Sequence, residues 1–405
     1  MRSSGRGTAS PSTRRRASIS NAPEPIAGHP AVSAPRIVRT RAALARYLRD
    51  RAPDGTIPDS RDHGLALAVP RAYLDLIDWA DPNDPLWRQV MPDHREGTIL
   101  PEELVDPIGD GTHSPVRGIV HRYRDRALML PTATCAVHCR FCFRREFVGR
   151  PEGNLRPDDL DAAFAYLAAH PEIWEVILSG GDVLVLGAAR LGEILTRLRA
   201  ISSVRVIRVH SRVPAVDPCL VTEAIAARLR AAAPLVVVVH VNHPREVSAE
   251  FTGAVSRLID RGIPVLSQTV LLRGVNDDVT VLDALCRRLV ETRVIPYQLH
   301  HPDLARGTSH FRLSIARGRR IVRELRRGLS GIANPTYVVD LPGGSGKVPA
   351  DGSHVLPTGS GYAVVREYTR GRSARSRASE GGGRRSGAHR TDIKLSGEPA
   401  SPTLT

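Results

Sequence analysis

Lysine is almost absent from this sequence of 405 residues. Among its 57 basic residues only Lys347 and Lys394 are lysines, and arginine supplies the rest. Because the chain uses arginine wherever positive charge is enough, a retained lysine indicates chemistry that a guanidinium cannot perform. Amine nucleophilicity is the obvious candidate, since lysine forms Schiff bases and arginine does not. Lys394 lies in a Gly-, Ser- and Arg-rich end, so Lys347 is the candidate. The alternative is chance survival of one lysine.

Long apolar runs are also absent. No stretch approaches the roughly 20 residues that a membrane-spanning helix needs, and the first 25 residues lack the apolar segment of a secretory signal. The cysteines number five, and three of them are clustered, a usage typical of a reducing compartment. The sequence therefore predicts a cytoplasmic protein without a membrane partner.

Acidic residues are scarce at the two ends of the chain. Residues 1–40 carry a net charge of +6 and residues 370–405 carry +5, whereas residues 41–369 carry +4 of the total of +15. We expect both ends to be disordered basic tails. Because the excess charge lies outside the nearly balanced middle, nucleic acid is not expected to be the partner that defines the activity.

The middle of the chain alternates between short β-rich runs and helix-compatible segments. Six runs are each followed by a helical segment, which predicts parallel strands joined by right-handed crossovers. The runs cover 128–133, 175–179, 204–210, 235–241, 264–272 and 294–300, and the helical segments cover 157–170, 188–200, 222–232, 247–261, 279–291 and 314–329. The expected fold class is α/β, a partial (β/α)6 barrel with functional residues at the carboxyl ends of its strands.

Five regions follow from this pattern. The barrel spans 128–330 and lies between an N-terminal helical and irregular layer at 41–127 and a C-terminal segment at 331–369 that contains Lys347. The two tails, 1–40 and 370–405, complete the chain. Within the outer regions we expect helices at 41–51 and 71–80, a strand at 336–339 and a β-element at 355–365.

Three cysteines follow the first barrel strand. Cys135, Cys139 and Cys142 have the spacing CxxxCxxC, and thiolates this close bind metal more readily than they form disulfides. A cubane iron–sulfur cluster usually has one protein ligand for each of its four irons, so three cysteines leave one iron open to a small molecule. A structural zinc site is the alternative, with His138 as a fourth ligand. His138 directly precedes Cys139, which disfavours that arrangement.

The second barrel strand ends in Ser179, Gly180, Gly181 and Asp182. Glycines at a strand end let the backbone approach a ligand closely, and the acid can accept hydrogen bonds from an amine. Placed one βα unit after the cysteine loop, this stretch resembles the glycine motif with which radical S-adenosylmethionine (SAM) enzymes hold the amino group of SAM. The cysteine spacing, with Phe141 before the last cysteine, resembles the signature of the same enzymes.

Further motifs resemble the lysine 2,3-aminomutase family, radical SAM enzymes that also use pyridoxal 5′-phosphate (PLP). The resemblance covers about 81–368, with ordered motifs at 121–126, 142–145, 242–244, 268–277, 310–312 and 340–347. It implies that the three cysteines ligate a [4Fe–4S] cluster and that SAM occupies the open iron. It also implies that Lys347 is the catalytic lysine that binds PLP. Arg122 and Arg126 match arginines of the PLP site, where a bidentate guanidinium suits phosphate.

The same resemblance implies how the substrate is held. Arg144 matches the residue that pairs with the substrate α-carboxylate, and Asp303 and Asp340 match two acids that receive its side-chain ammonium. Two carboxylates converging on one partly buried point need a cation between them, which predicts a cationic amino acid. The implied reaction is an isomerisation that moves the α-amino group of L-lysine to the β-carbon. Residues 298–302 are less Tyr-rich than the family pattern, so arginine is the competing substrate.

Several other expectations follow. No cysteine occurs after Cys286, so the C-terminal zinc cluster of some family members is not expected. The resemblance implies a low-potential electron donor such as flavodoxin or ferredoxin, and a homo-oligomer. Two rival functions are a radical SAM enzyme that modifies RNA and an iron–sulfur sensor that binds DNA through its tails. The first leaves Lys347 unexplained, and the second explains neither the glycine motif nor the acid pair.

Overall fold

The computed structural model describes residues 36–49, 51, 64–351, 355–358, 361–365 and 390–393. Most of both expected tails lies outside these residues. Two short stretches of them are described: β1 (Ile37–Val38) pairs with β2 (Val69–Pro70), and β14 (Arg390–Ile393) pairs with β13 (Gly361–Val365). They differ from the expectation of unstructured tails because β-branched residues favour a strand wherever a partner strand is present. β12 (Val355–Thr358) pairs with β13, as expected at 355–365.

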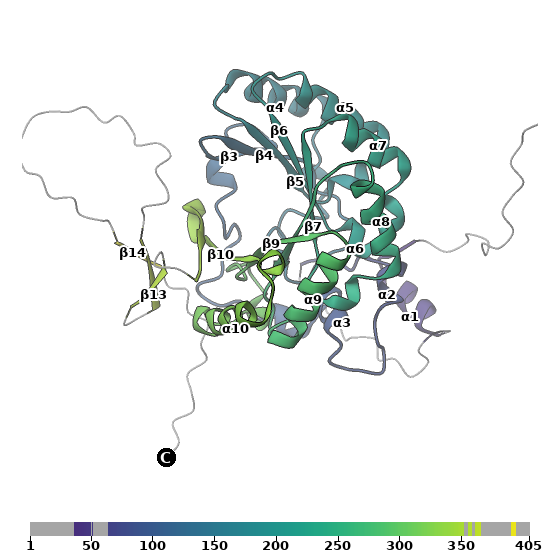
Figure 1. Cartoon of the computed structure of the whole chain (residues 1–405), viewed down its shortest axis with the longest axis vertical. Helices are drawn as coiled ribbons and strands as arrows, with labels where there is room; N and C mark the ends of the chain where they lie inside the picture. The colour runs from purple at the N-terminus through teal and green to yellow at the C-terminus, as the bar shows by residue number, and fades with distance from the viewer. Residues whose placement is uncertain are drawn as a thin grey trace, which may run out of the picture. The chain divides into compact units, whose positions relative to one another are not determined.

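Nine strands form one mixed sheet within the described residues, in the order β11-β10-β9-β8-β7-β6-β5-β4-β3. Neighbours from β4 to β10 are parallel, and β3 and β11 are antiparallel at the two ends. The sheet curves into a nearly closed barrel (Figure 1). The strands are β3 (Ile119–Tyr123), β4 (Arg126–Thr132), β5 (Glu175–Gly180), β6 (Val206–Ser211), β7 (Leu235–His240), β8 (Val265–Val270), β9 (Ile295–His300), β10 (Thr336–Leu341) and β11 (Gly346–Pro349).

The predicted α/β class and its six parallel barrel strands are confirmed. Three further strands extend the sheet. β3 comes from the expected N-terminal layer, and β10 and β11 come from the expected C-terminal segment. The domain boundaries themselves stay predictions.

Helices cover the outer face of the barrel (Figure 1). They are α4 (Pro157–Ala169), α5 (Gly187–Arg199), α7 (Glu223–Ala231), α8 (Ala249–Ile259), α9 (Val279–Glu291) and α10 (Ile315–Gly328). Thr222, Ser248 and Ser314 each accept a hydrogen bond from the backbone three residues on, which fixes the starts of α7, α8 and α10. All six helices lie where the sequence predicts them.

Alternation along the strands separates the hydrophobic core from the barrel interior. On β6, Ile207 and Val209 are buried in the core beneath the helices, so Arg208 and His210 take the opposite face. On β10 the apolar residues on either side of Asp340 belong to the core in the same way. The interior of the barrel therefore receives polar and charged side chains, as a reaction site requires.

The N-terminal layer contains α1 (Arg41–Arg49), α2 (Arg71–Leu74) and α3 (Pro85–Val90). The helix predicted at 71–80 is wrong beyond its first turn. Asp78 donates its backbone N–H to the carboxylate of Asp84 (3.0 Å), and the same carboxylate caps α3 through the N–H of Leu86 (2.8 Å). Side-chain acceptors in this Asp-rich stretch compete with the helical backbone bonds and end the helix.

One buried carboxylate ties this layer to the cysteine loop. Glu96 lies in the 3-10 turn His94–Gly97 and its side chain has no exposed surface. It accepts hydrogen bonds from Arg140 Nε (2.7 Å) and Nη2 (2.5 Å) and from Arg145 Nη2 (2.6 Å). Because Arg140 lies between the second and third cysteines of the CxxxCxxC motif, the N-terminal layer determines where this loop runs.

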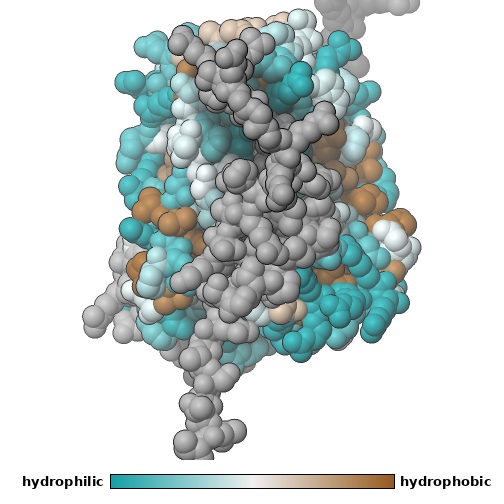
Figure 2. Space-filling view, turned by 90° about the vertical axis from the view of Figure 1, so that its left-hand side faces the viewer, coloured by the Kyte–Doolittle hydropathy of each residue, from teal (hydrophilic) through white to brown (hydrophobic). Residues whose placement is uncertain are grey.

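Large apolar side chains on the described surface are few and scattered: Ile99, Leu104, Val105, Trp174, Ile295 and Ile332. On the face drawn in Figure 2, hydrophilic residues surround small apolar patches. Among the described helices none combines the length and the apolar character needed to cross a membrane. The apolar surface of these elements is therefore used mainly inside the fold.

Replacing Glu96 by Gln should lower the free energy of unfolding by about 3–5 kcal/mol, because two buried guanidinium groups lose their counter-charge. Urea denaturation followed by circular dichroism measures the change. The matched control is Glu193→Gln, whose partner Arg190 lies 2.7 Å away on an exposed helix face, and there the loss should stay below about 1 kcal/mol. Equal losses in the two variants would contradict the anchoring role of Glu96.

Candidate active site

The start of the cysteine loop is fixed by Asn154. Its Oδ1 accepts hydrogen bonds from the hydroxyl of Thr132 (2.7 Å) and the backbone N–H of Ala133 (2.9 Å). The Thr132 hydroxyl accepts in turn from the N–H of Thr134 (3.0 Å). The chain therefore leaves β4 in a single defined path immediately before Cys135.

The three thiols of this loop interact electrostatically with one another. All are free cysteines. Burial raises the pKa of Cys142 to about 12, and the charge of Cys139 adds to the effect. Burial, together with the charges of Cys142, Asp182 and Cys139, also raises the pKa of Cys135. Cys135 and Cys142 therefore favour the protonated thiol unless metal cations replace their protons.

The donor set fits a cluster better than a single ion. No three His, Cys, Asp or Glu side chains of the described residues converge on one metal position. A cubane does not need such convergence, because each thiolate binds a different iron. The fourth ligand of the zinc alternative, His138, uses Nδ1 to contact the carbonyl oxygen of Ala66 (2.8 Å). The expected absence of zinc stays a prediction.

The glycine motif packs against the cysteine loop. The N–H of Gly181 donates to the carbonyl of Thr132 (2.7 Å), and the N–H of Asp182 donates to that of Thr134 (2.9 Å). A Cβ on Gly181 would overlap the Thr134 carbonyl, and one on Gly180 would lie 2.7 Å from the Thr132 carbonyl. These glycines therefore allow close approach, as predicted, but the partner in this structure is the loop backbone.

Asp182 differs from its predicted use as a free acceptor for an amine. It is buried, and its carboxylate accepts hydrogen bonds from the Ser211 hydroxyl (2.8 Å) and from the N–H groups of Arg212 (2.7 Å), Val213 (3.1 Å) and Leu184 (3.2 Å). It joins the ends of β5 and β6. Since these donors already engage both oxygens, Asp182 positions the site, and a direct contact with SAM would require some of them to be displaced.

Lys347 reaches into the barrel interior. Three glycines with left-handed φ angles, Gly343 (72°), Gly344 (82°) and Gly346 (101°), turn the chain between β10 and β11. The strand register then places Lys347 opposite Asp340. The lysine Nζ lies 2.8 Å from the Asp340 carboxylate and 3.0 Å from Nδ1 of His300.

The pKa values of the two predicted acids are shifted in opposite directions. Burial raises the pKa of Asp303 to about 8, and the charge of Asp340 adds to the effect. Burial also opposes ionisation of Asp340, yet the charge of Lys347 and the contact with His300 lower its pKa. The structure therefore brings Lys347 into contact with Asp340 and leaves Asp303 under the influence of both charges, and the roles of the two acids toward a substrate stay predictions.

Arg122 and Arg144 meet at a carboxylate that sequence reasoning missed. Asp110 accepts from Arg144 Nε (2.7 Å) and from Arg122 Nη2 (3.2 Å). Arg144 also donates to the hydroxyl of Ser179 (3.2 Å), at the end of β5. The side chains of both arginines are about nine-tenths buried.

Arg126 is placed less directly. Its guanidinium stacks on the ring of Tyr123 at 3.8 Å from the ring centre and pairs with Asp125 (2.9 Å). The Tyr123 hydroxyl accepts a hydrogen bond from the backbone N–H of Lys347 (2.8 Å). Arg126 therefore supports the lysine through Tyr123, and about one-third of its side chain is exposed.

A cavity of about 480 Å³ opens beside the arginine pair. Val120 and Leu130 line it from β3 and β4, Phe143 lines it from the cysteine loop, and Arg144 and Asp110 are part of its wall. Nearby, Nε of Arg122 and Nε2 of His210 and His300 are buried without a hydrogen-bond partner among the described residues. Buried polar groups are rarely left unpaired, so these atoms indicate that the interior accommodates polar ligands.

The comparisons with known proteins agree with this geometry. The family model of the Radical SAM superfamily matches residues 129–285. L-lysine 2,3-aminomutase of Clostridium subterminale is 40% identical over 304 residues, which cover 75% of this chain and 73% of that protein. The enzyme of the same name from Escherichia coli (strain K12) is 40% identical over 289 residues, covering 71% and 84%. This chain belongs to the L-lysine 2,3-aminomutase family.

Among solved structures, SuiB of Streptococcus suis bound to S-adenosylmethionine is similar with a TM-score of 0.40 and 10% identity, covering 54% of this chain and 47% of that one. Membership of the radical SAM superfamily implies a [4Fe–4S] cluster and SAM for this aminomutase-family chain. The CxxxCxxC cysteines supply a donor set of the required kind.

Four residues of this aminomutase-family site were not predicted: Asp110, Tyr123, His300 and Arg212. Tyr123 lies inside the motif 121–126 and Asp110 lies between two glycines, which were the available signals. His300 belongs to the stretch that departs from the family pattern. No sequence spacing pointed to a role for Arg212 in the site, because the residues that it contacts lie in four distant segments of the chain.

The stability of the ligand-free protein should depend on Asp303 between pH 4 and pH 8. The pKa of Asp303 is about 8 in the folded chain and about 4 when unfolded, so the folded state holds one proton more in this window. Stability is therefore lost as pH rises, by roughly 1.4 kcal/mol per unit for this group. Relative to Asp303→Asn, the wild type should lose stability up to about pH 8 and then remain level.

Urea midpoints of both proteins at several pH values measure this difference. Buried histidines such as His300 and His210 have lowered pKa values and change stability below about pH 6.5, in both proteins alike. The comparison between pH 7 and pH 9 therefore isolates Asp303. A difference that is independent of pH would show that Asp303 is ionised throughout.

Proposed function

We propose that this chain is a radical SAM, PLP-dependent 2,3-aminomutase that moves the α-amino group of L-lysine to the β-carbon and gives β-lysine. The observation that carries the proposal is the position of Lys347. It is the one lysine of the described residues, and its amine lies in the barrel interior between Asp340 and His300. A lysine with this placement suits a Schiff-base cofactor.

The matched motifs suggest which residues would hold each cofactor, and the geometry supports this assignment. Cys135, Cys139 and Cys142 would hold the cluster, with the glycine motif fixing their loop. Lys347 would hold PLP, and Arg122 and Arg126 would serve its phosphate. When bound, the cluster with SAM supplies radical chemistry, and PLP supplies the electron delocalisation that a nitrogen shift needs.

The substrate would be held at both ends. Lys347 neutralises Asp340 in this structure. Once the lysine amine is committed to the cofactor, Asp340 and Asp303 need another cation, and the side-chain ammonium of the substrate can supply it. Arg144 would then bind the α-carboxylate in place of Asp110. A substrate held at both ends presents one carbon to the reacting group. This lowers the entropic part of the activation barrier.

His300 is placed to take part in proton movement at Lys347. Its Nδ1 lies 3.0 Å from the lysine Nζ, and burial together with the charge of Lys347 lowers the pKa of His300. A neutral imidazole at this distance can accept a hydrogen bond from the lysine amine, which would orient the N–H bond along which the lysine loses its proton.

Three further expectations belong to this proposal. A low-potential flavodoxin or ferredoxin would reduce the cluster, the chain would assemble as a homo-oligomer, and the protein would work in a reducing cytoplasm. The scattered apolar side chains of the described surface do not mark one particular contact face.

Lys347→Ala should lose covalent PLP while it keeps the iron–sulfur cluster, because the amine is the only part of the site removed. The assay is borohydride treatment of the PLP-loaded protein followed by peptide mass spectrometry, with iron per chain measured in parallel. Lys347→Arg is the matched control, since it keeps a cation beside Asp340 but cannot form the linkage. Reducible attachment of PLP in either variant would remove Lys347 from this role.

An anaerobic assay with SAM, PLP and dithionite, with lysine and arginine offered in competition, should give β-lysine as the main product. Asp340→Asn should raise the KM for lysine by at least about tenfold, equivalent to roughly 1.4 kcal/mol, without a loss of iron. An unchanged KM would exclude Asp340 from substrate binding. Preferred turnover of arginine would correct the substrate but not the reaction type.

A further inference from the structure

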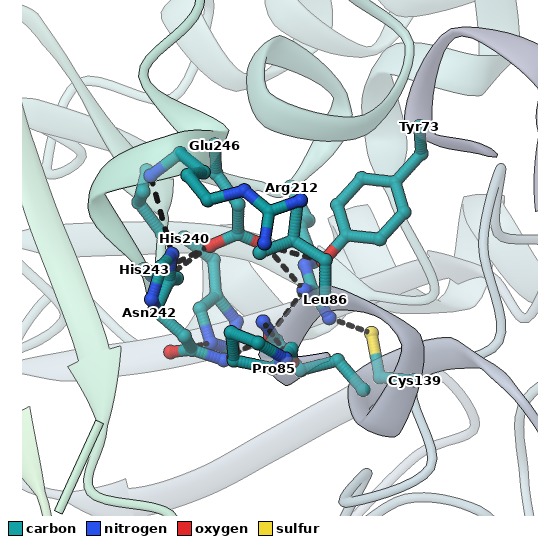
Figure 3. A network of polar contacts seen from close by, with 12 residues as sticks. Tyr73, Pro85, Leu86, Cys139, Arg212, His240, Asn242, His243 and Glu246 are labelled. Atoms are coloured by element: carbon teal, nitrogen blue, oxygen red, sulfur yellow. Dashed lines mark hydrogen bonds and ion pairs between the residues drawn. The ribbon is translucent and has the colours of Figure 1, made fainter. Parts of the chain in front are cut away.

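A guanidinium outside the predicted site contacts one cysteine of the loop. Arg212 follows β6 and precedes the short helix α6 (Val213–Val216). Its Nη1 lies 2.7 Å from the sulfur of Cys139, and 6% of its side chain is exposed. Figure 3 shows the guanidinium directed at this sulfur. A buried cation in contact with a cysteine sulfur acts directly on any metal that the sulfur binds.

The far side of the guanidinium is held by a buried polar network (Figure 3). Arg212 Nη2 donates to Gln89 Oε1 (2.6 Å) and Glu246 Oε1 (2.8 Å). Glu246 is itself fixed, because it accepts from the Tyr73 hydroxyl (2.8 Å) and the N–H of Asn242 (2.5 Å). Asn242 also donates to Gln89 (3.0 Å). Arg212 therefore cannot turn from Cys139 without breaking contacts with the N-terminal layer and with the 3-10 turn Pro244–Glu246 that follows β7.

Aromatic rings exclude water from the same contact. The guanidinium carbon of Arg212 lies 5.1 Å from the ring centre of Phe141 and 5.7 Å from that of Tyr73. Charges interact more strongly in such a low-dielectric environment than in water. The positive charge of Arg212 thus acts on Cys139 with little screening.

Reduction of a [4Fe–4S] cluster adds one negative charge without making or breaking a bond. Its potential depends on net charge, hydrogen bonds to the sulfurs and exposure. A cationic N–H donor at a ligand sulfur stabilises the reduced form, and a carboxylate behind that donor opposes it. We propose that Arg212 raises the reduction potential of the cluster through Cys139, and that Glu246 and Gln89 hold it in position to do so. This inference rests on Cys139 as a cluster ligand. The electron comes from a low-potential one-electron donor.

The alternative is that Arg212 serves only to neutralise Glu246 inside the fold. The two roles differ in one measurable quantity, because a purely structural arginine leaves the cluster potential unchanged. The full-length protein, reconstituted anaerobically and kept free of SAM, is titrated potentiometrically while the reduced cluster is followed by electron paramagnetic resonance. Iron per chain is determined for every variant.

In Arg212→Gln the ratio of reduced to oxidised cluster at a fixed potential should fall at least tenfold, which for one electron corresponds to a shift of about 59 mV to more negative potential. Arg212→Lys keeps the charge and should retain most of the wild-type potential. Glu246→Gln removes the opposing charge and should move the potential in the positive direction.

Arg208→Gln is the matched control. Arg208 lies on β6, the strand that Arg212 follows, and pairs with buried Glu175 (2.6 Å). It lies four residues and therefore about 13 Å before Arg212. Its potential should equal that of the wild type. An equal shift in this variant, or an unchanged potential in an iron-replete Arg212→Gln protein, overturns the proposal.

Loss of the cluster in Arg212→Gln would not leave the question open, because Glu246→Gln still carries Arg212. A more positive potential there supports the proposal, and an unchanged one overturns it. A Cys139→Ala protein that keeps a full cluster would instead overturn the ligand assignment. That result is read from iron content and not from the potential, so the two failures are distinguishable.

Discussion

Several buried arginines of the described chain lie against carboxylates, since burial of an unpaired ion costs several kcal/mol. Glu96 satisfies Arg140 and Arg145, Asp110 satisfies Arg122 and Arg144, and Glu246 satisfies Arg212. These pairs connect the N-terminal layer, the cysteine loop and the strand ends. The positions of the reactive groups therefore depend on matched charges as much as on the hydrophobic core.

The same requirement makes the site exchangeable. In the proposed function, a pair such as Lys347–Asp340 or Arg144–Asp110 would be opened by the ligand, because a substrate carboxylate or ammonium can replace one member of the pair. The desolvation cost of binding a charged substrate is then lower than in an apolar cavity, since the protein already surrounds this position with groups that stabilise charge. Glu96 and Glu246 differ in this respect: they are wholly buried and hold fixed arginines.

Much of the fold could be predicted from the sequence, because its signals are local. The alternation of apolar runs with helical segments located β4 to β9 and all six outer helices within a few residues. The helix after Arg71 was overestimated, since the competing acceptor Asp84 lies outside the segment. The edge strands β3 and β11 were missed for a related reason: they are short, and pairing with the sheet stabilises them.

For the site, residue types and spacing pointed to the cysteines and Lys347, and the family resemblance pointed to the two acids; the roles of these residues stay predictions. The contacts of Asp110, Tyr123 and Arg212 depend on residues 12 to 224 positions apart or on several segments at once, and no local pattern contains that information. Asp182 is the opposite case, in which a residue was predicted but its contacts were not. Its motif was recognised, but its hydrogen bonds to Ser211 and the following backbone could only be seen in the folded chain.

The first and last strands of the barrel each have a paired strand on one side only, unlike the other strands. β3 and β11 end the sheet order and are not paired with each other in the described chain, yet the Tyr123 hydroxyl on β3 reaches the backbone of Lys347 on β11. A ligand attached to Lys347 and bound by Arg122 would bridge β3 and β11 across this unpaired seam of the barrel. Closure of the barrel would then become a consequence of loading the site, and an empty barrel could open along the seam without breaking any strand pairing.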